Sequence, residues 1–227
     1  MEKIENQINL TNISLKLLIL GDATVGKTSL ITRYCTKEFQ QVYITTIGVD
    51  KRRKNLNINN NQIKIIMWDT AGQERYRAIN KSFYKGTDGV VLAFDLNKKK
   101  TIININYWIG QLYKESNVEN LGIVLVGTKK DLFNINDSEN VDKNEIEEAC
   151  NKYTIKFFET SSKTGEGVKD MFEYLIKLTL SKKNFNELPF DGNLDNYKII
   201  EFDKKEEDEI NKKEMEKFMV VKKKKCC

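Results

Sequence analysis

The stretch that decides the fold is residues 21–28, which read Gly21-Asp22-Ala23-Thr24-Val25-Gly26-Lys27-Thr28. It follows the apolar run Leu15–Leu20 and precedes a helix-like stretch, the context that a phosphate-binding loop requires. In such a loop the glycines let backbone N–H groups point at phosphate oxygens, and the helix N-terminus adds its positive dipole end. Lys27 should reach the β- and γ-phosphates, and the Thr28 hydroxyl should ligate Mg²⁺. The predicted phosphate contacts are Asp22, Ala23, Thr24, Val25, Gly26, Lys27, Thr28 and Ser29.

Apolar runs typical of strands alternate with amphipathic segments typical of helices. The predicted strands are Leu15–Leu20, Val42–Ile58, Ile63–Trp68, Gly89–Phe94, Leu121–Val126 and Ile155–Phe158. The predicted later helices cover about residues 101–116, 142–151 and 167–180. This order predicts a three-layer α/β fold, with helices on both faces of a six-stranded, mostly parallel sheet that contains one antiparallel hairpin strand. Ligands of such sheets bind at the carboxyl ends of the strands.

Composition narrows the class of protein. The chain has 227 residues, a net charge of +5, four cysteines and no histidine. The small, dispersed charge gives no argument for a nucleic-acid partner. Cys35 and Cys150 lie in helix-like stretches and are interpreted as buried apolar residues in a reducing compartment. The first 13 residues have no apolar segment of the kind found in a secretory signal, and no apolar run is long enough to span a bilayer.

A second motif, Trp68-Asp69-Thr70-Ala71-Gly72-Gln73-Glu74, follows the predicted third strand. The Asp69 carboxylate, at the end of a core strand, can hold Mg²⁺ through water. Gly72 has no Cβ, so its N–H can approach the γ-phosphate. Gln73 carries both a donor and an acceptor, as needed to orient an attacking water. This loop is therefore predicted to provide a metal ligand and a residue that positions the nucleophile.

Two further loops predict which base is recognised. Thr128, Lys129 and Asp131 follow the fifth strand, and an Asp carboxylate accepts the two adjacent hydrogen bonds that guanine offers and adenine does not. The stretch Ser161-Ser162-Lys163 follows the last strand, and its backbone N–H groups are placed to read guanine O6. The four motifs, in this order, predict a site for GTP or GDP with Mg²⁺.

On these motifs, the chain resembles a Rab-family small GTPase of the Ras superfamily over about residues 14–180. The stretch Tyr43–Asp50 is similar to the Rab switch I. The resemblance implies that Tyr43 contacts the nucleotide, and that Thr46 joins Mg²⁺ and the γ-phosphate. It also implies that Phe39 stacks on guanine, although Phe39 read alone also fits a core aromatic of the first helix. The catalytic residues implied are Gln73, Lys27, Thr46 and Gly72.

Four residues depart from the Rab pattern. Ala23 occupies a loop position that is Ser in most Rabs, Thr128 replaces the usual Asn of the guanine motif, and Ser162 replaces Ala. Lys51 replaces a Phe that belongs to an effector-facing aromatic patch with Trp68 and Phe83. We expect Lys51 either to pair with an acidic residue of an effector, or to lay its stem over Trp68 with its ammonium in water.

The tail, residues 181–227, mixes basic and acidic side chains and is predicted to be a disordered tether after the GTP-binding domain 14–180. Residues 1–13 are predicted to be a flexible N-terminal extension. It ends in Lys222-Lys223-Lys224-Lys225-Cys226-Cys227, which resembles the Rab signal for two geranylgeranyl groups. The alternative is that the four lysines are simply a solvated basic segment and that the two cysteines carry no lipid.

The resemblance implies a monomeric switch on the cytoplasmic face of an intracellular membrane, cycling with the cytosol, that serves vesicle trafficking. Its implied partners are an exchange factor, a GTPase-activating protein, an escort or GDP-dissociation-inhibitor protein, and effectors at switches I and II. The main alternative is a GTP-binding recruitment module with little or no hydrolysis, suggested by Ala23 and Lys51 and opposed by the intact Gln73.

Overall fold

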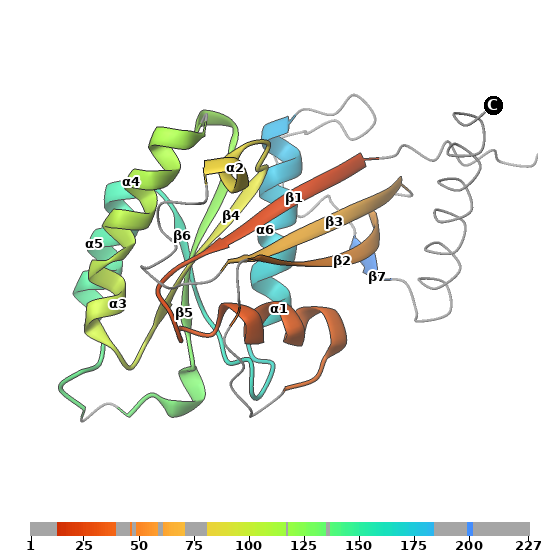
Figure 1. The fold of residues 1–227 in the computed structure, drawn as a ribbon. Coiled ribbons are helices and arrows are strands. Elements are labelled where there is room, and N and C mark those ends of the chain that lie inside the picture. The colour runs from red at the N-terminus through yellow and green to blue at the C-terminus, as the bar shows by residue number, and fades with distance from the viewer. Residues whose placement is uncertain are drawn as a thin grey trace, which may run out of the picture.

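A computed structural model describes residues 13–39, 46, 49–58, 61–70, 81–116, 118–134, 137–183 and 199–201 of the 227-residue chain. These residues form a seven-stranded sheet of order β6-β5-β4-β1-β3-β2-β7 (Figure 1). The strands are β1 (Ile13–Leu20), β2 (Val49–Ile58), β3 (Asn61–Thr70), β4 (Gly89–Asp95), β5 (Gly122–Thr128), β6 (Lys156–Glu159) and β7 (Ile199–Glu201). Strands β1, β3, β4, β5 and β6 are parallel, whereas β2 is antiparallel to both β3 and β7.

Helices cover both faces of the sheet, so the predicted three-layer architecture is confirmed (Figure 1). They are α1 (Lys27–Thr36), α2 (Lys81–Tyr84), α3 (Lys99–Ile103), α4 (Ile105–Glu115), α5 (Lys143–Tyr153) and α6 (Val168–Lys183), with 3-10 turns η2 (Val118–Asn120) and η3 (Lys130–Leu132). Helices α1 and α6 pack on one face, and α4 and α5 pack on the other. Among the described residues, no helix combines the length and the apolar character needed to cross a membrane.

The core follows directly from strand periodicity. Leu15, Leu17 and Ile19 of β1 face α1 and α6, while Leu18 and Leu20 face the α4 side. Strand β4 lies near the centre of the sheet with both faces covered, and all seven of its residues are buried. A strand buried on both faces reads as the continuous apolar run seen in the sequence. The parallel strands therefore end together at one edge of the sheet, where the predicted motifs follow them.

Strand β7 is the main difference from the prediction. The six predicted strands are confirmed, although β2 begins at Val49 and most of residues 42–48 lie outside the described part. The seventh strand, Ile199–Glu201, pairs with Leu56–Ile58 of β2 and lies inside the segment 181–227, which was predicted to be disordered. The strand β2 otherwise ends the sheet with unpaired backbone groups, and two adjacent isoleucines favour a strand there. Helix α6 also continues to Lys183, past the predicted domain end at 180.

Candidate nucleotide-binding site

The phosphate-binding loop joins β1 to α1 and depends on two glycines. Gly21 has φ 146°, and a Cβ there would lie 2.1 Å from the carbonyl oxygen of Ala93. Gly26 has φ 100° and is the N-cap of α1. Thr24 also has a positive φ, 63°, which is unusual for a β-branched residue. Such backbone strain is concentrated at functional sites, and here it falls inside the predicted phosphate loop.

Lys27 is the first residue of α1 and is only 5% exposed. Its ammonium donates to the carbonyl oxygens of Gly21 at 2.9 Å and Asp22 at 2.7 Å. Burial lowers the pKa of Lys27 to about 8, and the carboxylates of Asp69 and Asp22 oppose this shift. The loop therefore encloses a cation beneath the N-terminus of a helix, and both favour an anion.

The three predicted metal ligands meet at the start of α1. The Thr28 hydroxyl donates to Asp69 Oδ2 at 2.6 Å and lies 2.9 Å from the Thr46 hydroxyl. Burial raises the pKa of Asp69, and its second oxygen, Oδ1, is buried without a hydrogen-bond partner. The described residues contain no cluster of three acidic or cysteine side chains that could hold a metal by themselves. The residues thus fit a Mg²⁺ ion that takes hydroxyl, carboxylate and phosphate oxygens as ligands.

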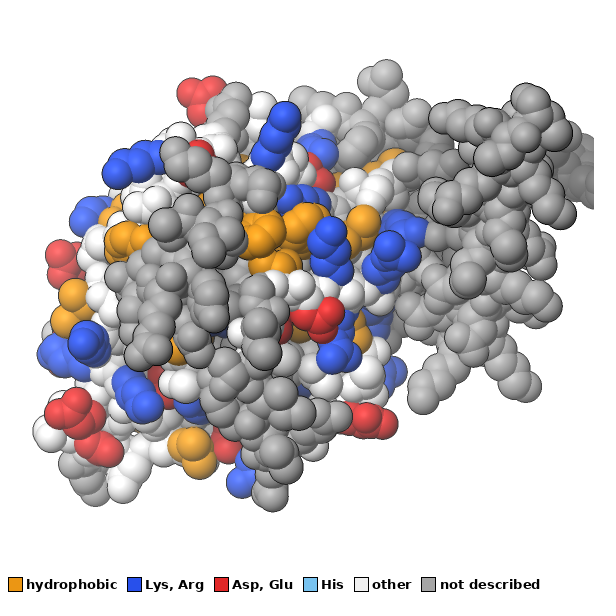
Figure 2. Space-filling view, viewed as in Figure 1, with side chains coloured by type: hydrophobic (Ala, Val, Ile, Leu, Met, Phe, Trp, Pro, Cys, Tyr) orange, Lys and Arg blue, Asp and Glu red, His pale blue; other side chains and the backbone are white. Residues whose placement is uncertain are grey.

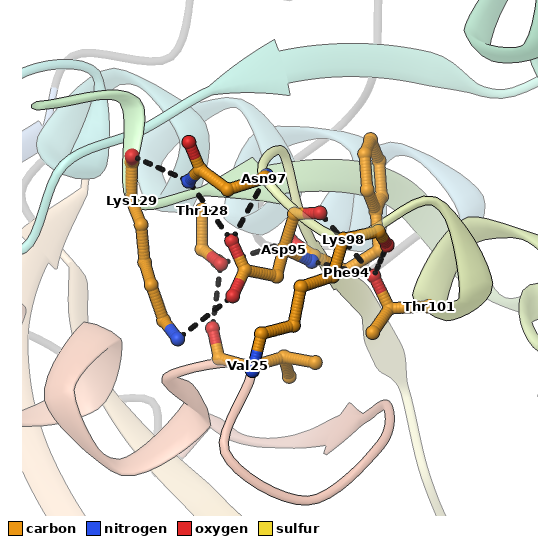
Figure 3. Close-up of polar contacts among 8 residues, drawn as sticks. All are labelled: Val25, Phe94, Asp95, Asn97, Lys98, Thr101, Thr128 and Lys129. Atoms are coloured by element: carbon orange, nitrogen blue, oxygen red, sulfur yellow. Dashed lines mark hydrogen bonds and ion pairs between the residues drawn. The ribbon is translucent and has the colours of Figure 1, made fainter. Parts of the chain in front are cut away.

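The end of β5 is tied to the phosphate-binding loop. Thr128 Oγ1 lies 2.5 Å from the carbonyl oxygen of Val25 and 2.9 Å from that of Phe94 (Figure 3). Its single O–H donates to either oxygen, so this threonine links the loop to both β4 and β5. The departure from the usual Asn at position 128 is therefore accommodated by the backbone around it.

Lys129 is held beside the loop by Asp95. Its ammonium lies 2.8 Å from Asp95 Oδ2, and the Asp95 side chain is only 2% exposed (Figure 3). Asn97 donates to Asp95 Oδ1 and to the Lys129 carbonyl oxygen, at 3.0 Å and 3.2 Å. The Lys129 side chain also lies beside Gly26, where a Cβ would be 4.0 Å from Cε. These contacts fix a lysine stem between the phosphate loop and the predicted base site.

The two predicted base-reading loops are joined. Ser161, which is fully buried, donates through its hydroxyl to Asp131 Oδ1 at 2.6 Å. The backbone N–H of Lys130 donates to the Thr160 carbonyl oxygen at 3.1 Å. Arg33 of α1 donates to the carbonyl oxygens of Ser162 and Lys163. One Asp131 oxygen is thus held in place, while the other accepts no hydrogen bond from the described part of the chain and can accept from base N–H groups.

Sequence reasoning missed two groups that shape this site. Asp95 and Asn97 hold Lys129, although a carboxylate directly after the apolar run of β4 was a signal of the same kind as Asp69. The second group is the pair Asn104 and Trp108, which bind the Asp22 carboxylate. No pattern in the sequence connects these residues with a loop more than 80 positions away.

Some predicted residues cannot be placed. Tyr43, Gly72, Gln73, Cys226 and Cys227 lie outside the described residues. Phe39 follows α1 and is 36% exposed, so it is not a core aromatic of that helix. Its predicted stacking on guanine stays a prediction. Cys35 in α1 and Cys150 in α5 form no disulfide within the described residues, and they are half-buried rather than fully buried.

A second surface lies around Trp68 of β3, on the same face of the sheet as α4. The ammonium groups of Lys16 and Lys51 lie 4.1 Å and 3.9 Å from the centre of the Trp68 ring. Trp68 also contacts the Phe83 ring at 5.8 Å between centres. On the face seen in Figure 2, hydrophobic side chains lie beside several Lys and Arg side chains. The second expectation for Lys51, with its stem over Trp68 and its ammonium in water, is met only in part: the side chain lies at Trp68, but it is the ammonium that sits over the ring.

Comparison with known proteins agrees with this geometry. The model of the Ras family matches residues 16–181. The chain is 36% identical to Ras-related protein Rab-27B of Bos taurus over 178 residues, which is 74% of this chain and 80% of the relative. It is 38% identical to Ras-related protein Rab-1D of Dictyostelium discoideum over 157 residues, 69% of this chain and 75% of the relative. It is also 38% identical to Ras-related protein Rab-18-B of Danio rerio over 167 residues, with coverages of 74% and 80%.

Proposed function

Because the chain belongs to the Rab family of Ras-superfamily GTPases, we propose that it is a GTP/GDP switch that hydrolyses GTP slowly and recruits effectors in vesicle trafficking. The observation that carries this proposal is the convergence of two sets of side chains at one edge of the sheet. Lys27, Thr28, Thr46 and Asp69 gather where phosphates and Mg²⁺ would bind. The hydrogen-bonded pair of Asp131 and Ser161 lies in the loops that follow β5 and β6, at the same edge.

Hydrolysis in this site rests on positioning and charge. Lys27 supplies the charge beneath the β- and γ-phosphates, and bound Mg²⁺ would neutralise charge on their oxygens. Thr28, Thr46 and Asp69 are the residues that would hold the metal. Gln73 is proposed to orient the attacking water, with the Gly72 N–H on the γ-phosphate. Because Thr46 and Gly72 would touch only the γ-phosphate, losing it releases both switch segments.

We infer that an activating protein supplies the missing charge. Arg33, the one arginine of α1, donates hydrogen bonds to the carbonyl oxygens of Ser162 and Lys163. Its guanidinium therefore supports these loops and is not proposed as a catalytic charge. Arg75 and Arg77 follow Gln73 and lie outside the described residues. Because we assign Arg75 and Arg77 to switch II contacts rather than to hydrolysis, intrinsic turnover is expected on the order of 10⁻³ per second or less. The exchange factor, dissociation inhibitor and effectors are proposed from family membership.

Membrane attachment is proposed from the sequence of the C-terminus. Two geranylgeranyl groups on Cys226 and Cys227 would give stable anchoring, whereas one lipid gives marginal binding. The four lysines 222–225 would add about 1 kcal/mol each at an anionic leaflet. The protein would then cycle between the cytosol and the cytoplasmic face of an intracellular membrane.

The test of the switch is single-turnover phosphate release from purified, GTP-loaded protein. We expect slow release by the natural protein and slower release by Gln73→Leu, with unchanged GTP affinity, because the water loses its orienting group. Equal rates for the two proteins, with and without an activating protein, would instead favour the recruitment module that does not hydrolyse GTP. Failure to bind GTP at all would overturn both proposals.

A further inference from the structure

The phosphate-binding loop is bound to a helix that carries no part of the nucleotide site. Asp22 Oδ1 accepts a hydrogen bond from the indole N–H of Trp108 at 2.9 Å, and Asp22 Oδ2 accepts one from the side-chain amide of Asn104 at 2.6 Å. The backbone carbonyl of the same aspartate accepts from the Lys27 ammonium at 2.7 Å. Asp22 therefore touches the phosphate-binding lysine through its backbone and the α3–α4 junction through its side chain.

The donors of this contact are themselves firmly placed. Asn104 lies between α3 and α4, and its carbonyl oxygen accepts from the backbone N–H groups of Tyr107 and Trp108. The four-residue spacing puts the Asn104 and Trp108 side chains on one face of the helical turn. Trp108 is 6% exposed and packs in the core beneath β4 and β5. Since an indole N–H can only donate, losing the carboxylate would leave a buried donor without a partner.

We propose that Asp22 is a positioning residue whose clamp to Asn104 and Trp108 sets the rate of nucleotide release. The inference rests on the proposed GTP/GDP switch. A phosphate-binding loop binds tightly only while its N–H groups stay aimed at one point, and its strained Thr24 favours other shapes of the loop. Two charge-assisted hydrogen bonds to a core helix oppose such rearrangement. The α3–α4 junction is thereby coupled to the phosphate site.

The side-chain chemistry allows a swap experiment. Asn104→Asp presents a second carboxylate to Asp22 and breaks the contact. Asp22→Asn removes the charge that strengthens both hydrogen bonds, and the Asn104 amide must turn its oxygen toward the new N–H₂ to keep a neutral one. In the double variant Asp22→Asn/Asn104→Asp, residue 22 can donate to the carboxylate at 104 and still accept from Trp108. Dissociation of the fluorescent nucleotide mantGDP from full-length protein is the measurement. We expect at least tenfold faster dissociation for Asn104→Asp, several-fold faster dissociation for Asp22→Asn, and a rate within threefold of the natural protein for the double variant.

Two controls separate positioning from a general loss of structure or charge. Asn106→Asp is the same substitution two residues along the same helix, where the side chain accepts from Lys152 and Tyr153, and it should leave dissociation unchanged. Trp108→Phe keeps the Asp22 charge near Lys27 but removes one donor, and should speed dissociation several-fold. If a single variant fails to fold by circular dichroism, Trp108→Phe still tests the clamp.

The outcomes are distinguishable from failure of the switch itself. A natural protein that binds no mantGDP overturns the proposed function. A protein that binds it, but whose Asn104→Asp or Trp108→Phe variants release it at the natural rate, overturns only the clamp. The clamp is also overturned if the dissociation rate of the double variant is raised by the product of the two single-variant factors, because the restored pair would then have no effect on release.

Discussion

The Thr28 hydroxyl donates to Asp69 Oδ2 at 2.6 Å, while Asp69 Oδ1 is buried with no hydrogen-bond partner. The two residues come from the start of α1 and the end of β3, 41 positions apart in the chain. A buried acceptor without a partner is costly, and a divalent cation at this place would supply one. The same cation would counter the burial that raises the pKa of Asp69.

The first prediction concerns this metal site. Replacing Asp69 with Asn keeps the shape but removes the charge that would hold Mg²⁺, so the nucleotide should lose its dependence on the metal. In the natural protein, chelation with EDTA should speed mantGDP release by more than tenfold. In Asp69→Asn, release should already be fast with Mg²⁺ present, and EDTA should change it less than threefold. An unchanged EDTA response in the variant would contradict the assignment.

The second prediction concerns the stability of the nucleotide-free protein against pH. Lys27 has a pKa of about 8 when folded, against 10.5 for a free lysine. Between these values the folded state binds fewer protons than the unfolded state, so the free energy of unfolding should rise with pH. Between pH 7.5 and 9.5, Lys27 should contribute about 2 kcal/mol of added stability.

Urea unfolding of the natural protein and Lys27→Met at both pH values isolates this contribution. Methionine has no proton to lose, so the natural protein should gain stability relative to the variant as pH rises. The upper limit of pH 9.5 keeps Tyr84 neutral, because burial raises its pKa to about 12. If the free energy of unfolding of the natural protein, minus that of Lys27→Met, stays constant or falls as pH rises, Lys27 is not deprotonated in the folded protein.

The third prediction concerns base recognition. Asp131→Asn replaces a carboxylate that accepts two hydrogen bonds with an amide that accepts and donates, so guanine loses a partner and xanthine gains one. Sites that pair buried polar groups reject analogues that lack them by about 10⁴-fold. We expect the variant to lose at least 10²-fold in GTP affinity and to prefer xanthosine triphosphate, measured by competition against mantGDP. Equal loss for both nucleotides would mean that Asp131 only supports the loop through Ser161.

Much of the fold and site followed from local patterns. The phosphate loop was predictable because its glycines, Lys27 and Thr28 lie within eight consecutive residues, 21–28. An apolar run typical of a strand precedes this loop, and a helix-like stretch follows it. Two of the metal ligands, Thr28 and Asp69, were predictable in the same way, since Asp69 lies at the end of a core strand, whereas Thr46 was implied only by the family resemblance. Parallel strands bring such residues to one edge of the sheet whatever their separation in sequence.

What escaped prediction depends on pairings between distant segments. Strand β7 has only three residues, and its pairing with β2 is set by an open sheet edge rather than by its own pattern. The Asp22 clamp likewise requires knowing how Trp108 packs against the start of the loop. Asp95 lay within reach of sequence reasoning, but its partner Lys129 was assigned only to the nucleotide.

The surface around Trp68 provides the setting for the last prediction. Lys51 pairs across the sheet with Trp68 and places its ammonium over the ring, and the described residues contain no carboxylate partner for it. Lys16 lies over the same ring but also donates to the carbonyl oxygens of Phe83 and Lys85. Lys51 is therefore the ammonium that an acidic group of an effector could reach.

We predict that Lys51→Phe changes effector choice while leaving nucleotide binding and release within twofold of the natural values. Phenylalanine would turn a hydrated, charged contact into a dry aromatic one, and desolvating lysine costs several kcal/mol unless a carboxylate compensates. Arg53→Phe, which puts phenylalanine in place of another exposed cation two residues along β2, is the matched control. Proteins loaded with a non-hydrolysable GTP analogue are compared by pull-down and quantitative mass spectrometry. If Lys51→Phe keeps the natural set of partners as fully as Arg53→Phe does, Lys51 takes no part in effector choice.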